Sequence, residues 1–355
     1  MRVLVAPLDW GLGHATRCVP VVREFLRQGA EVELAVVKAN SNFFSEVFPD
    51  VKQHMAPSYG IVYPKHGYNM ALWLIKNSAH LNLVMREEHR FAEEMTKKNG
   101  YDVLFSDNRF AFYSKNAYNV YMTHQRRIAF PPAFAAFEGV GQMWHARLMK
   151  KFNEVWVPDL EKEPGYAGNL SHVDYCPQPV KFVGPLSRFE SAVESKKDIY
   201  VMAVVSGVEP ARSRFEEKLR EALRKIPGKH VMVLGKPYAG FKNWTEGNIE
   251  FFSHLPIEKF ARTVARSQWV VSRGGYSTIM DMAVLGAKCI CVPTPGQYEQ
   301  IVLTRDLAKK GCLVKIDDAK FNEKTLKDAF DLKVALPKPE KQNLLSSAIS
   351  SLFHK

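Results

Sequence analysis

The sequence lacks any long apolar run. Across its 355 residues, no apolar stretch approaches the ~18 residues that a membrane-spanning helix needs. Its 46% hydrophobic and 24% charged residues are ordinary for a soluble globular protein. Residues 2–7 predict a strand that leads directly into a glycine turn, which is not the pattern of a signal peptide. We therefore expect a cytoplasmic protein that does not span a membrane.

Cysteine is scarce, and the acidic residues form no metal-binding pattern. The five cysteines include no CxxC pair, and their odd number is typical of free thiols in a reducing compartment. Cys289 and Cys291 alternate along a predicted buried strand, where core packing explains them. No DxD motif is present to recruit a divalent ion, and we interpret Asp317 and Asp318 as solvated surface. We expect neither a metal nor a cofactor.

Acidic charge is in deficit, with 49 Lys and Arg against 37 Asp and Glu, a net charge of +12. A basic protein attracts nucleic acid, anionic membranes or phosphorylated substrates. The basic residues form no single run and no nucleic-acid motif, so a nucleic-acid partner is not expected.

Two segments combine apolar and basic residues, 63–86 and 126–152. The basic residues of the second segment are Arg126, Arg127, Arg147, Lys150 and Lys151. Apolar surface rimmed with cations suits the interface of an anionic bilayer. The alternative is that the apolar residues belong to the core and the cations form its solvated rim.

A glycine turn in the second half of the chain is the strongest local signal. Residues 269–272 predict a strand that enters Gly274 and Gly275, where the backbone can approach a ligand closely. Ser277 and Thr278 can cap the helix that follows. The unpaired N–H groups and the positive dipole end of such a helix favour an anion, such as a phosphate.

The residues after this turn complete a strand–helix–strand unit. Asp281 lies one turn into the helix, Gly286 ends it, and residues 289–293 predict the next strand. Glu299 and Gln300 come just beyond that strand. In open parallel sheets, ligands bind at the carboxyl ends of the strands.

A second glycine turn lies near the N-terminus. Residues 2–7 predict a strand, 11–17 a turn, and 15–28 a helix that stops at Gly29, with another strand over 31–37. Two such turns, each opening its own half of the chain, predict an α/β protein of two Rossmann-like domains that face a shared cleft.

The pattern of apolar runs supports two domains. Further strands are predicted over 102–107, 119–124, 154–158, 199–207 and 230–235, with helices over 216–225 and 342–353. Residues 181–188 are typical of a crossover between domains, because Gly184 and Pro185 break regular structure. We predict an N-terminal acceptor domain over 1–185, a C-terminal donor domain over 186–335 and a tail helix over 336–355.

Together, these motifs resemble those of the GT-B glycosyltransferases, in particular family 28. That family includes the bacterial N-acetylglucosaminyltransferase that acts on the lipid-linked peptidoglycan precursor. The resemblance is strongest over residues 254–300. It implies a GT-B fold and a UDP-sugar as the donor substrate. The acceptor is unknown, and a lipid-linked molecule is the candidate.

The resemblance also implies the donor-binding residues. Leu255 would lie near the uracil, and the turn that contains Arg273 would lie beside the diphosphate. Asp281 stands where the family usually has a glutamate, and it would contact the ribose hydroxyls. The acidic–Gln pair at 299–300 would hold the donor sugar. The donor-side residues are Ser206, Gly207, Leu255, Arg273, Gly274, Gly275, Ser277, Thr278, Asp281, Glu299 and Gln300.

On the acceptor side, the resemblance places Gly11, Gly13 and His14 in the first glycine turn and His124 in a polar motif. Histidine suits the removal of the acceptor proton, because its pKa of ~6.5 lies near working pH. A carboxylate such as Asp107 would hold its tautomer. The alternatives are a helix cap or phosphate contact for His14, a strand-end cap for Asp107 and a core position for His124.

Helix-end amides and Arg273 can stabilise the leaving diphosphate without a metal, and Arg188 is a further candidate. The sequence therefore predicts a glycosyltransferase that moves a hexose or an N-acetylhexosamine. Three alternatives remain. GLGHATRC also resembles the turn of pseudaminic-acid pathway hydrolases, which share the fold and use water. A nonhydrolysing epimerase has the same fold. A non-catalytic nucleotide-sugar-binding protein would need no base.

Overall fold

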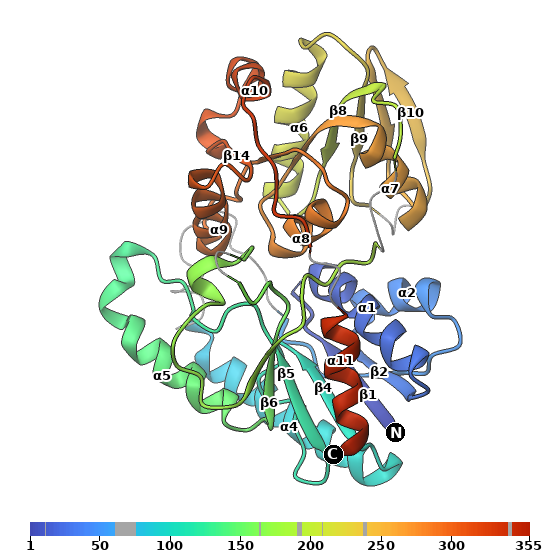
Figure 1. The fold of residues 1–355 in the computed structure, drawn as a ribbon, viewed down its shortest axis with the longest axis vertical. Helices are drawn as coiled ribbons and strands as arrows, with labels where there is room; N and C mark the ends of the chain where they lie inside the picture. Colours follow the sequence, from blue (N-terminus) through green and yellow to red (C-terminus); the bar gives the residue numbers. More distant parts are fainter. Residues whose placement is uncertain are drawn as a thin grey trace. The chain divides into compact units, whose positions relative to one another are not determined.

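The computed structural model describes residues 1–10, 12–60, 76–162, 165–189, 194–207, 209–236, 240–339 and 343–355. They divide into two compact units (Figure 1). Unit 1 comprises the described residues up to 187 together with 343–355, and unit 2 comprises those from 188 to 339. Of the tail predicted over 336–355, residues 343–355 thus belong to unit 1 and residues 336–339 to unit 2.

Unit 1 is built on a seven-stranded parallel sheet of order β3-β2-β1-β4-β5-β6-β7. The strands are β1 (Arg2–Pro7), β2 (Glu31–Val36), β3 (Gln53–Met55), β4 (Val103–Asp107), β5 (Tyr118–Met122), β6 (Glu154–Val157) and β7 (Val180–Phe182). The central strands β1 and β4 are apolar over most of their length and are buried except for Arg2, as a parallel sheet covered on both faces requires.

Helices cover this sheet. They are α1 (Leu12–Arg27), α2 (Lys38–Val47), α4 (Ser78–Asn99), α5 (Glu138–Met149) and α11 (Leu344–Ser350), with 3₁₀ turns η1 (Pro132–Phe137), η2 (Gly168–Leu170) and η5 (Ser351–His354). The apolar face of α1 packs into the core, and the helix ends at Arg27, two residues before Gly29, whose φ of +82° suits glycine. The C-terminal α11 lies beside α1 and adds Ala348 and Ile349 to the same core (Figure 1).

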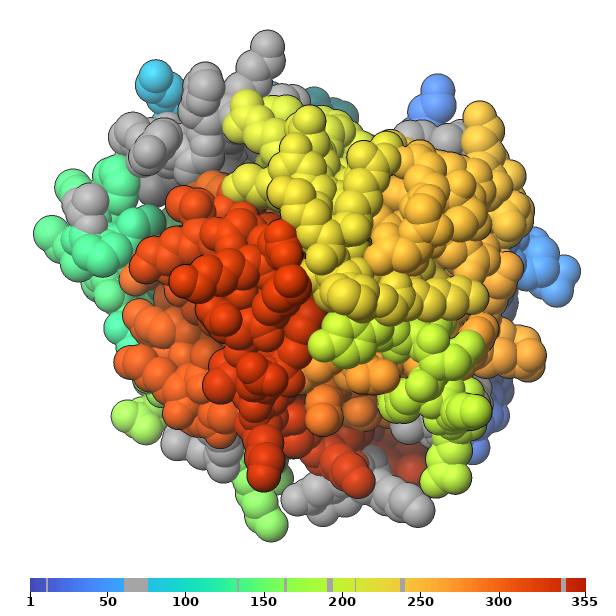
Figure 2. All heavy atoms as spheres, turned by 90° about the horizontal axis from the view of Figure 1, so that it is seen from above, coloured from blue at the N-terminus to red at the C-terminus, as the bar shows by residue number. Residues whose placement is uncertain are grey.

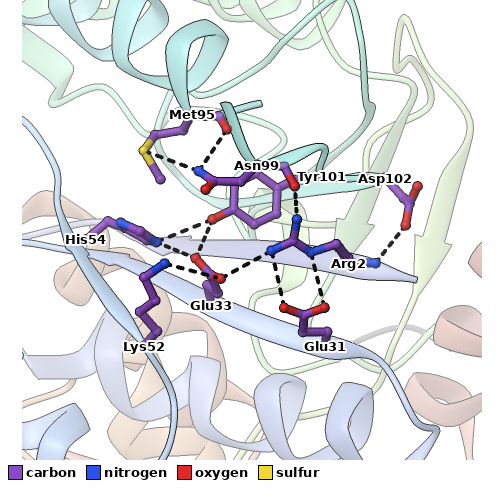
Figure 3. Close-up of polar contacts among 9 residues, drawn as sticks. All are labelled: Arg2, Glu31, Glu33, Lys52, His54, Met95, Asn99, Tyr101 and Asp102. Atoms are coloured by element: carbon purple, nitrogen blue, oxygen red, sulfur yellow. Dashed lines mark hydrogen bonds and ion pairs between the residues drawn. The ribbon is translucent and has the colours of Figure 1, made fainter. Parts of the chain in front are cut away.

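The amino edge of the unit 1 sheet is closed by a polar network (Figure 3). The buried carboxylate of Glu33 accepts hydrogen bonds from the Tyr101 hydroxyl at 2.5 Å and from His54. Arg2 pairs with Glu31 at 3.1 Å. These groups satisfy one another, so we interpret this edge as structural.

Unit 2 contains a second seven-stranded sheet of order β10-β11-β9-β8-β12-β13-β14. Its strands are β8 (Ile199–Val204), β9 (His230–Val233), β10 (Asn243–Glu246), β11 (Ile249–Phe252), β12 (Ser267–Ser272), β13 (Cys289–Cys291) and β14 (Val314–Lys315). The β10–β11 pair is antiparallel and the other pairs are parallel.

The helices of unit 2 are α6 (Ala211–Arg224), α7 (Ile257–Arg266), α8 (Tyr276–Val284), α9 (Tyr298–Lys309) and α10 (Glu323–Phe330), with the 3₁₀ turn η4 (Asp318–Lys320). The helix α6, yellow in Figure 2, packs beside the orange-red α10. Among the described helices of both units, none has the length and apolar character that crossing a bilayer requires.

The predicted strands and helices are largely confirmed, with differences at their ends. Helix α1 begins at Leu12 and not at residue 15, so His14 lies inside its first turn. The strand predicted over 199–207 ends at Val204. Helix α6 begins at Ala211 and not at 216. The β10–β11 hairpin had no counterpart in the sequence analysis.

Candidate active site

Polar side chains of unit 1 gather at the carboxyl edge of its central strands. Asp107 is the last residue of β4, which lies between β1 and β5. His124 follows the end of β5 by two residues, and His14 lies in the first turn of α1. This is the edge at which open α/β sheets bind ligands. The structure thus brings the predicted His14, Asp107 and His124 to one place.

His14 and Asp107 form a hydrogen-bonded pair. The ring Nδ1 lies 3.0 Å from Oδ2 of Asp107. Because an ionised carboxylate only accepts hydrogen bonds, Nδ1 carries the proton and Nε2 keeps the lone pair. The side chain of His14 is 15% exposed and that of Asp107 is fully buried. This arrangement of an orienting carboxylate and a reachable imidazole can support general-base chemistry.

Arg17, which the sequence analysis did not select, is part of the same group. Its guanidinium is 2% exposed, and its Nε lies 2.9 Å from both carboxylate oxygens of Asp107. Its Nη2 also donates to Asp107. Its spacing in the sequence could have identified it, because Arg17 is three residues after His14 and therefore lies on the same face of the helix.

These charges set the pKa values of the group. Burial by itself would raise the pKa of Asp107, but the Arg17 cation and His14 lower it to about 2. Burial lowers the pKa of His14, and Arg17 lowers it further, while Asp107 opposes both. Asp107 is therefore a carboxylate and His14 a neutral imidazole at neutral pH.

His124 joins the group through Arg17. Its Nδ1 lies 3.0 Å from Nη1 of Arg17, and its side chain is buried. The buried thiol of Cys18 donates to Oδ2 of Asp107 at 3.6 Å. Burial and the Asp107 charge raise the pKa of this thiol well above its usual value, so Cys18 is unsuited to act as a nucleophile.

The glycines of this turn are described in part. Gly11 lies outside the described residues. Gly13 is half-buried, and its carbonyl oxygen accepts a hydrogen bond from the Thr16 hydroxyl at 3.0 Å.

In unit 2, the predicted strand–turn–helix is present. Strand β12 ends at Ser272, and Gly275 is the N-cap residue of α8. The prediction that Ser277 and Thr278 cap this helix is wrong, because both lie inside its first turn and the N-cap makes no side-chain hydrogen bond. A Cβ at Gly274 would overlap the methyl group of Thr304, so glycine lets α9 pack directly on the turn.

The side chain of Arg273 points into the interior. It is 3% exposed and donates to the Val292 carbonyl at 3.1 Å and to Asp318 at 2.7 Å. Its guanidinium also lies over the Phe215 ring at 3.9 Å. The prediction that this guanidinium meets the diphosphate is therefore wrong for this conformation. Of the two residues interpreted as solvated surface, Asp317 is exposed, but Asp318 is only 18% exposed and pairs with both Arg273 and Lys218.

Arg188 and Asp281 form a second charged group in unit 2. The Nε of Arg188 lies 3.7 Å from Oδ2 of Asp281. The guanidinium lies over the rings of Phe189 at 4.9 Å and Phe260 at 5.1 Å. Leu255, which the resemblance places near the uracil, is half-buried just before α7. Asp281, the predicted contact of the ribose hydroxyls, thus has a cation beside it, and two aromatic rings lie against that cation.

The Glu299–Gln300 pair lies in the first turn of α9, and both residues are half-buried. The Oε1 atom of Gln300 accepts the Thr294 N–H at 2.8 Å, and its Nε2 donates to Gln297. These bonds hold the Gln300 amide against the loop after β13. Ser206 is half-buried and Gly207 is exposed, with a φ of +105°, in the turn that follows β8.

Part of the segment 126–152 forms an exposed apolar surface. We call Phe137, Val140, Met143 and Trp144 of η1 and α5 the α5 apolar patch; each is at least 45% exposed. The segment also carries the exposed Arg147, Lys150 and Lys151. Arg127 pairs with Glu138, and Arg126 donates to the Ser171 carbonyl, so these two cations are partly engaged. Most of the other segment, 63–86, lies outside the described residues.

A search for metal ligands within the described ranges gives no cluster of three or more His, Cys, Asp or Glu side chains. Whether the protein works without a metal or a cofactor stays a prediction.

Comparison with known proteins supports the resemblance seen in the sequence. Residues 228–351 match the glycosyltransferase family 28 C-terminal domain. The chain is 23% identical over 212 residues to the UDP-N-acetylglucosamine–N-acetylmuramyl-(pentapeptide) pyrophosphoryl-undecaprenol N-acetylglucosamine transferase of Desulforamulus reducens, covering 55% of this chain and 56% of that protein. It is 35% identical over 89 residues to the transferase of the same name from Rhodopseudomonas palustris, covering 24% and 23%. The chain thus spans about half and about a quarter of these relatives.

Solved structures extend the likeness to the whole chain. A glycotransferase of kitacinnamycin aligns with a TM-score of 0.64 and 13% identity, over 99% of this chain and 94% of that one. MurG from Acinetobacter baumannii aligns with a TM-score of 0.60 and 12% identity, over 100% and 99%. At such identities the likeness concerns the fold. Together the comparisons confirm a GT-B fold of two Rossmann-like domains and show that the chain is similar to glycosyltransferase family 28.

Proposed function

Since the chain has the GT-B fold and carries a glycosyltransferase family 28 C-terminal domain, we propose that it is a glycosyltransferase. It moves a hexose or an N-acetylhexosamine from a UDP-sugar to an acceptor hydroxyl. The observation that carries this proposal is the His14–Asp107 pair at the carboxyl edge of the unit 1 sheet, with Nδ1 and Oδ2 3.0 Å apart.

In the proposed reaction, Nε2 of His14 takes the proton of the acceptor hydroxyl. The acceptor oxygen bonds to the anomeric carbon of the donor sugar, and the bond from that carbon to the diphosphate breaks. Asp107 keeps His14 in the tautomer with Nδ1–H and stabilises the imidazolium as it forms. A positioned base of this kind contributes about 10²- to 10⁴-fold to the rate.

Unit 2 holds the donor in this proposal. Asp281 accepts the ribose hydroxyls, the backbone near Leu255 meets the uracil, and Glu299 and Gln300 orient the sugar. The half-buried or buried positions of these residues beside α7, α8 and α9 support such contacts. Ser206 and Gly207 form a second loop at the carboxyl end of β8, where phosphate is bound in sheets of this type.

The leaving diphosphate needs positive charge. We assign this part to the N-terminal amides of α8 and to Arg188, because the guanidinium of Arg273 is engaged in the interior. Helix-end amides and a guanidinium offset a developing anion electrostatically. On this basis we propose a metal-independent reaction, in which a chelator leaves the rate unchanged.

The acceptor is proposed to be lipid-linked, with the protein acting peripherally at the cytoplasmic face of an anionic membrane. Support comes from the α5 apolar patch with Arg147, Lys150 and Lys151 beside it. Apolar side chains flanked by cations bind the interface of an anionic bilayer, because they bury apolar area in the lipid and the cations are attracted to the anionic headgroups.

To test this function, the protein is incubated with a panel of nucleotide sugars, with and without a membrane lipid extract as the source of acceptor. We expect UDP release that depends on the extract, together with a glycosylated lipid. Release of free sugar without any acceptor would instead identify the hydrolase to which GLGHATRC also points. Binding of a nucleotide sugar without turnover under either condition would indicate a non-catalytic binding protein.

A further inference from the structure

Arg17 connects the two histidines of the unit 1 site, His14 through Asp107 and His124 directly. Its Nε lies 2.9 Å from each oxygen of Asp107, which in turn holds Nδ1 of His14 at 3.0 Å. Its Nη1 lies 3.0 Å from Nδ1 of His124. One buried guanidinium therefore links the two imidazole rings through short hydrogen bonds.

These bonds fix where the protons are. A guanidinium has only donors, so Nδ1 of His124 must accept, and the proton of that neutral ring is on Nε2. A carboxylate has only acceptors, so Nδ1 of His14 must donate, and its lone pair is on Nε2. The two histidines are therefore held in opposite tautomers by one connected network.

We propose that Arg17 is a positioning residue that holds the two histidines in opposite tautomers and so keeps Nε2 of His14 available as the base. His14 presents a lone pair at Nε2 and acts as the base, whereas His124, whose side chain is buried, keeps its proton on Nε2 and leaves Nδ1 to accept from Arg17. The catalytic part of this inference rests on the proposed function. The assignment of tautomers does not, because it concerns the protein without substrate.

Arginine is required for this task, and lysine cannot replace it. The planar guanidinium donates from one side to a carboxylate while another N–H points to His124. An ammonium group at the end of a flexible stem lacks that fixed fork, so it would retain the charge beside Asp107 and lose one of the two directions. Since Arg17 is 2% exposed, water has little access to restore the missing bond.

The test measures tautomers by NMR on the full chain with ¹⁵N-labelled histidine, without substrate. Two- and three-bond ¹⁵N–¹H correlations distinguish a protonated Nδ1 from a protonated Nε2, and the His14→Gln and His124→Gln variants assign the signals. We expect a protonated Nδ1 for His14 and a protonated Nε2 for His124. A protonated Nδ1 at His124, or a protonated Nε2 at neutral His14, overturns the inference.

The second arm compares Arg17→Lys with Arg27→Lys, the same substitution at an exposed position of the same helix. In Arg17→Lys we expect His124 to gain a population with a protonated Nδ1. We also expect turnover to fall by about 10- to 100-fold, the range found for orienting partners of metal-bound histidines. Arg27→Lys should change neither quantity.

Unchanged tautomers in a folded Arg17→Lys protein would contradict the positioning role. If Arg17→Lys does not fold, the wild-type spectrum alone decides the assignment. Opposite tautomers in a protein that transfers no sugar would refute the proposed function and leave the assignment standing. Transfer by a protein whose histidines share one tautomer would refute the inference alone.

Discussion

Arg188 and Asp281 form an ion pair in unit 2, with Nε of the arginine 3.7 Å from Oδ2 of the aspartate. Asp281 is buried, and two aromatic rings flank the guanidinium. The pair holds a carboxylate and a cation in fixed positions near the start of α8. A ribose hydroxyl and a phosphate of one nucleotide would meet these two groups, which connects the ion pair to the choice of donor.

The first prediction concerns the ribose. UDP should raise the melting temperature of the wild-type protein, with a stabilisation of roughly 2.7 kcal/mol at 100 times Kd. The 2′-deoxy analogue should stabilise it less, because it offers Asp281 one hydroxyl fewer. In Asp281→Ala the two nucleotides should become equivalent and both weaker, as measured by thermal shift and calorimetry.

The matched control is Asp331→Ala, which removes an exposed carboxylate of the same unit. It should retain the preference for UDP. If no uridine nucleotide shifts the wild-type melting curve, the donor assignment is wrong. A preference for UDP that survives in Asp281→Ala would move the ribose contact to another residue.

The second prediction concerns pH. His14 is faced by Arg17 on its own helix, by Asp107 on β4 and by His124 after β5, and burial and Arg17 together lower its pKa below the ordinary 6.5. A base is active when it is neutral, so the acid limb of kcat/KM should lie below pH 6.5. Asp107→Asn removes the group that raises this pKa, so the limb should move further to the acid side while the maximal rate falls.

Initial rates of both proteins over the acidic and neutral range measure this limb. An acid limb above the ordinary value of histidine in the wild-type protein would mean that another group titrates. A limb that moves toward neutral pH in Asp107→Asn would contradict the sign of the Asp107 effect.

The third prediction concerns the contact of the donor turn with α9. Gly274→Ala should destabilise unit 2 by about 1–3 kcal/mol, because its Cβ overlaps the methyl group of Thr304, and threonine is stiff about χ1. Gly274→Ala combined with Thr304→Ser, which removes that methyl group, should recover most of the loss. Denaturant unfolding followed by fluorescence measures each free energy.

Gly139→Ala is the matched control, because a Cβ there has no neighbour within 4 Å and the residue is inside α5. It should stabilise unit 1 slightly, by up to about 1 kcal/mol. If Gly274→Ala is as harmless as Gly139→Ala, the turn and α9 are less closely packed than described.

The fourth prediction concerns the membrane. The protein should sediment with anionic vesicles and not with neutral ones, and salt should release it, because salt screens surface charges. Replacing Arg147, Lys150 and Lys151 with glutamate should abolish the binding. Trp144→Ala should weaken it without changing its dependence on salt.

A triple change of the exposed Lys324, Lys327 and Lys333 to glutamate alters the net charge by the same amount at a different place. This control should keep most of the vesicle binding. Equal recovery with anionic and neutral vesicles, or equal loss in both triple variants, would mean that the α5 apolar patch is not a membrane contact.

The fold could be predicted because its determinants are local in the sequence. Apolar runs of strand length alternate with helical stretches, and two of these runs enter glycine turns, which predicts two parallel sheets; the comparisons confirm the GT-B fold. The position of Asp107 follows from the end of β4, and that of His14 from the turn after β1. Their contact at 3.0 Å is a consequence of the neighbouring strands.

The directions of long side chains could not be predicted in this way. Arg273 was placed beside the diphosphate because its backbone belongs to the turn, but its guanidinium extends into the interior toward Asp318, 45 residues along the chain. The same reasoning missed Arg17, whose role depends on two partners about 90 and 107 residues away. A sequence pattern locates Cα atoms on a strand or a helix, whereas these contacts depend on rotamers and on tertiary packing.

The most direct test of His14 as the base compares the turnover of His14→Ala with that of the wild-type protein, with UDP binding measured on the same samples. We predict a turnover lower by about 10²- to 10⁴-fold, an unchanged melting temperature and an unchanged affinity for UDP, because His14 lies in unit 1 and the proposed donor residues lie in unit 2. Turnover close to that of the wild-type protein would contradict the assignment of His14 as the base.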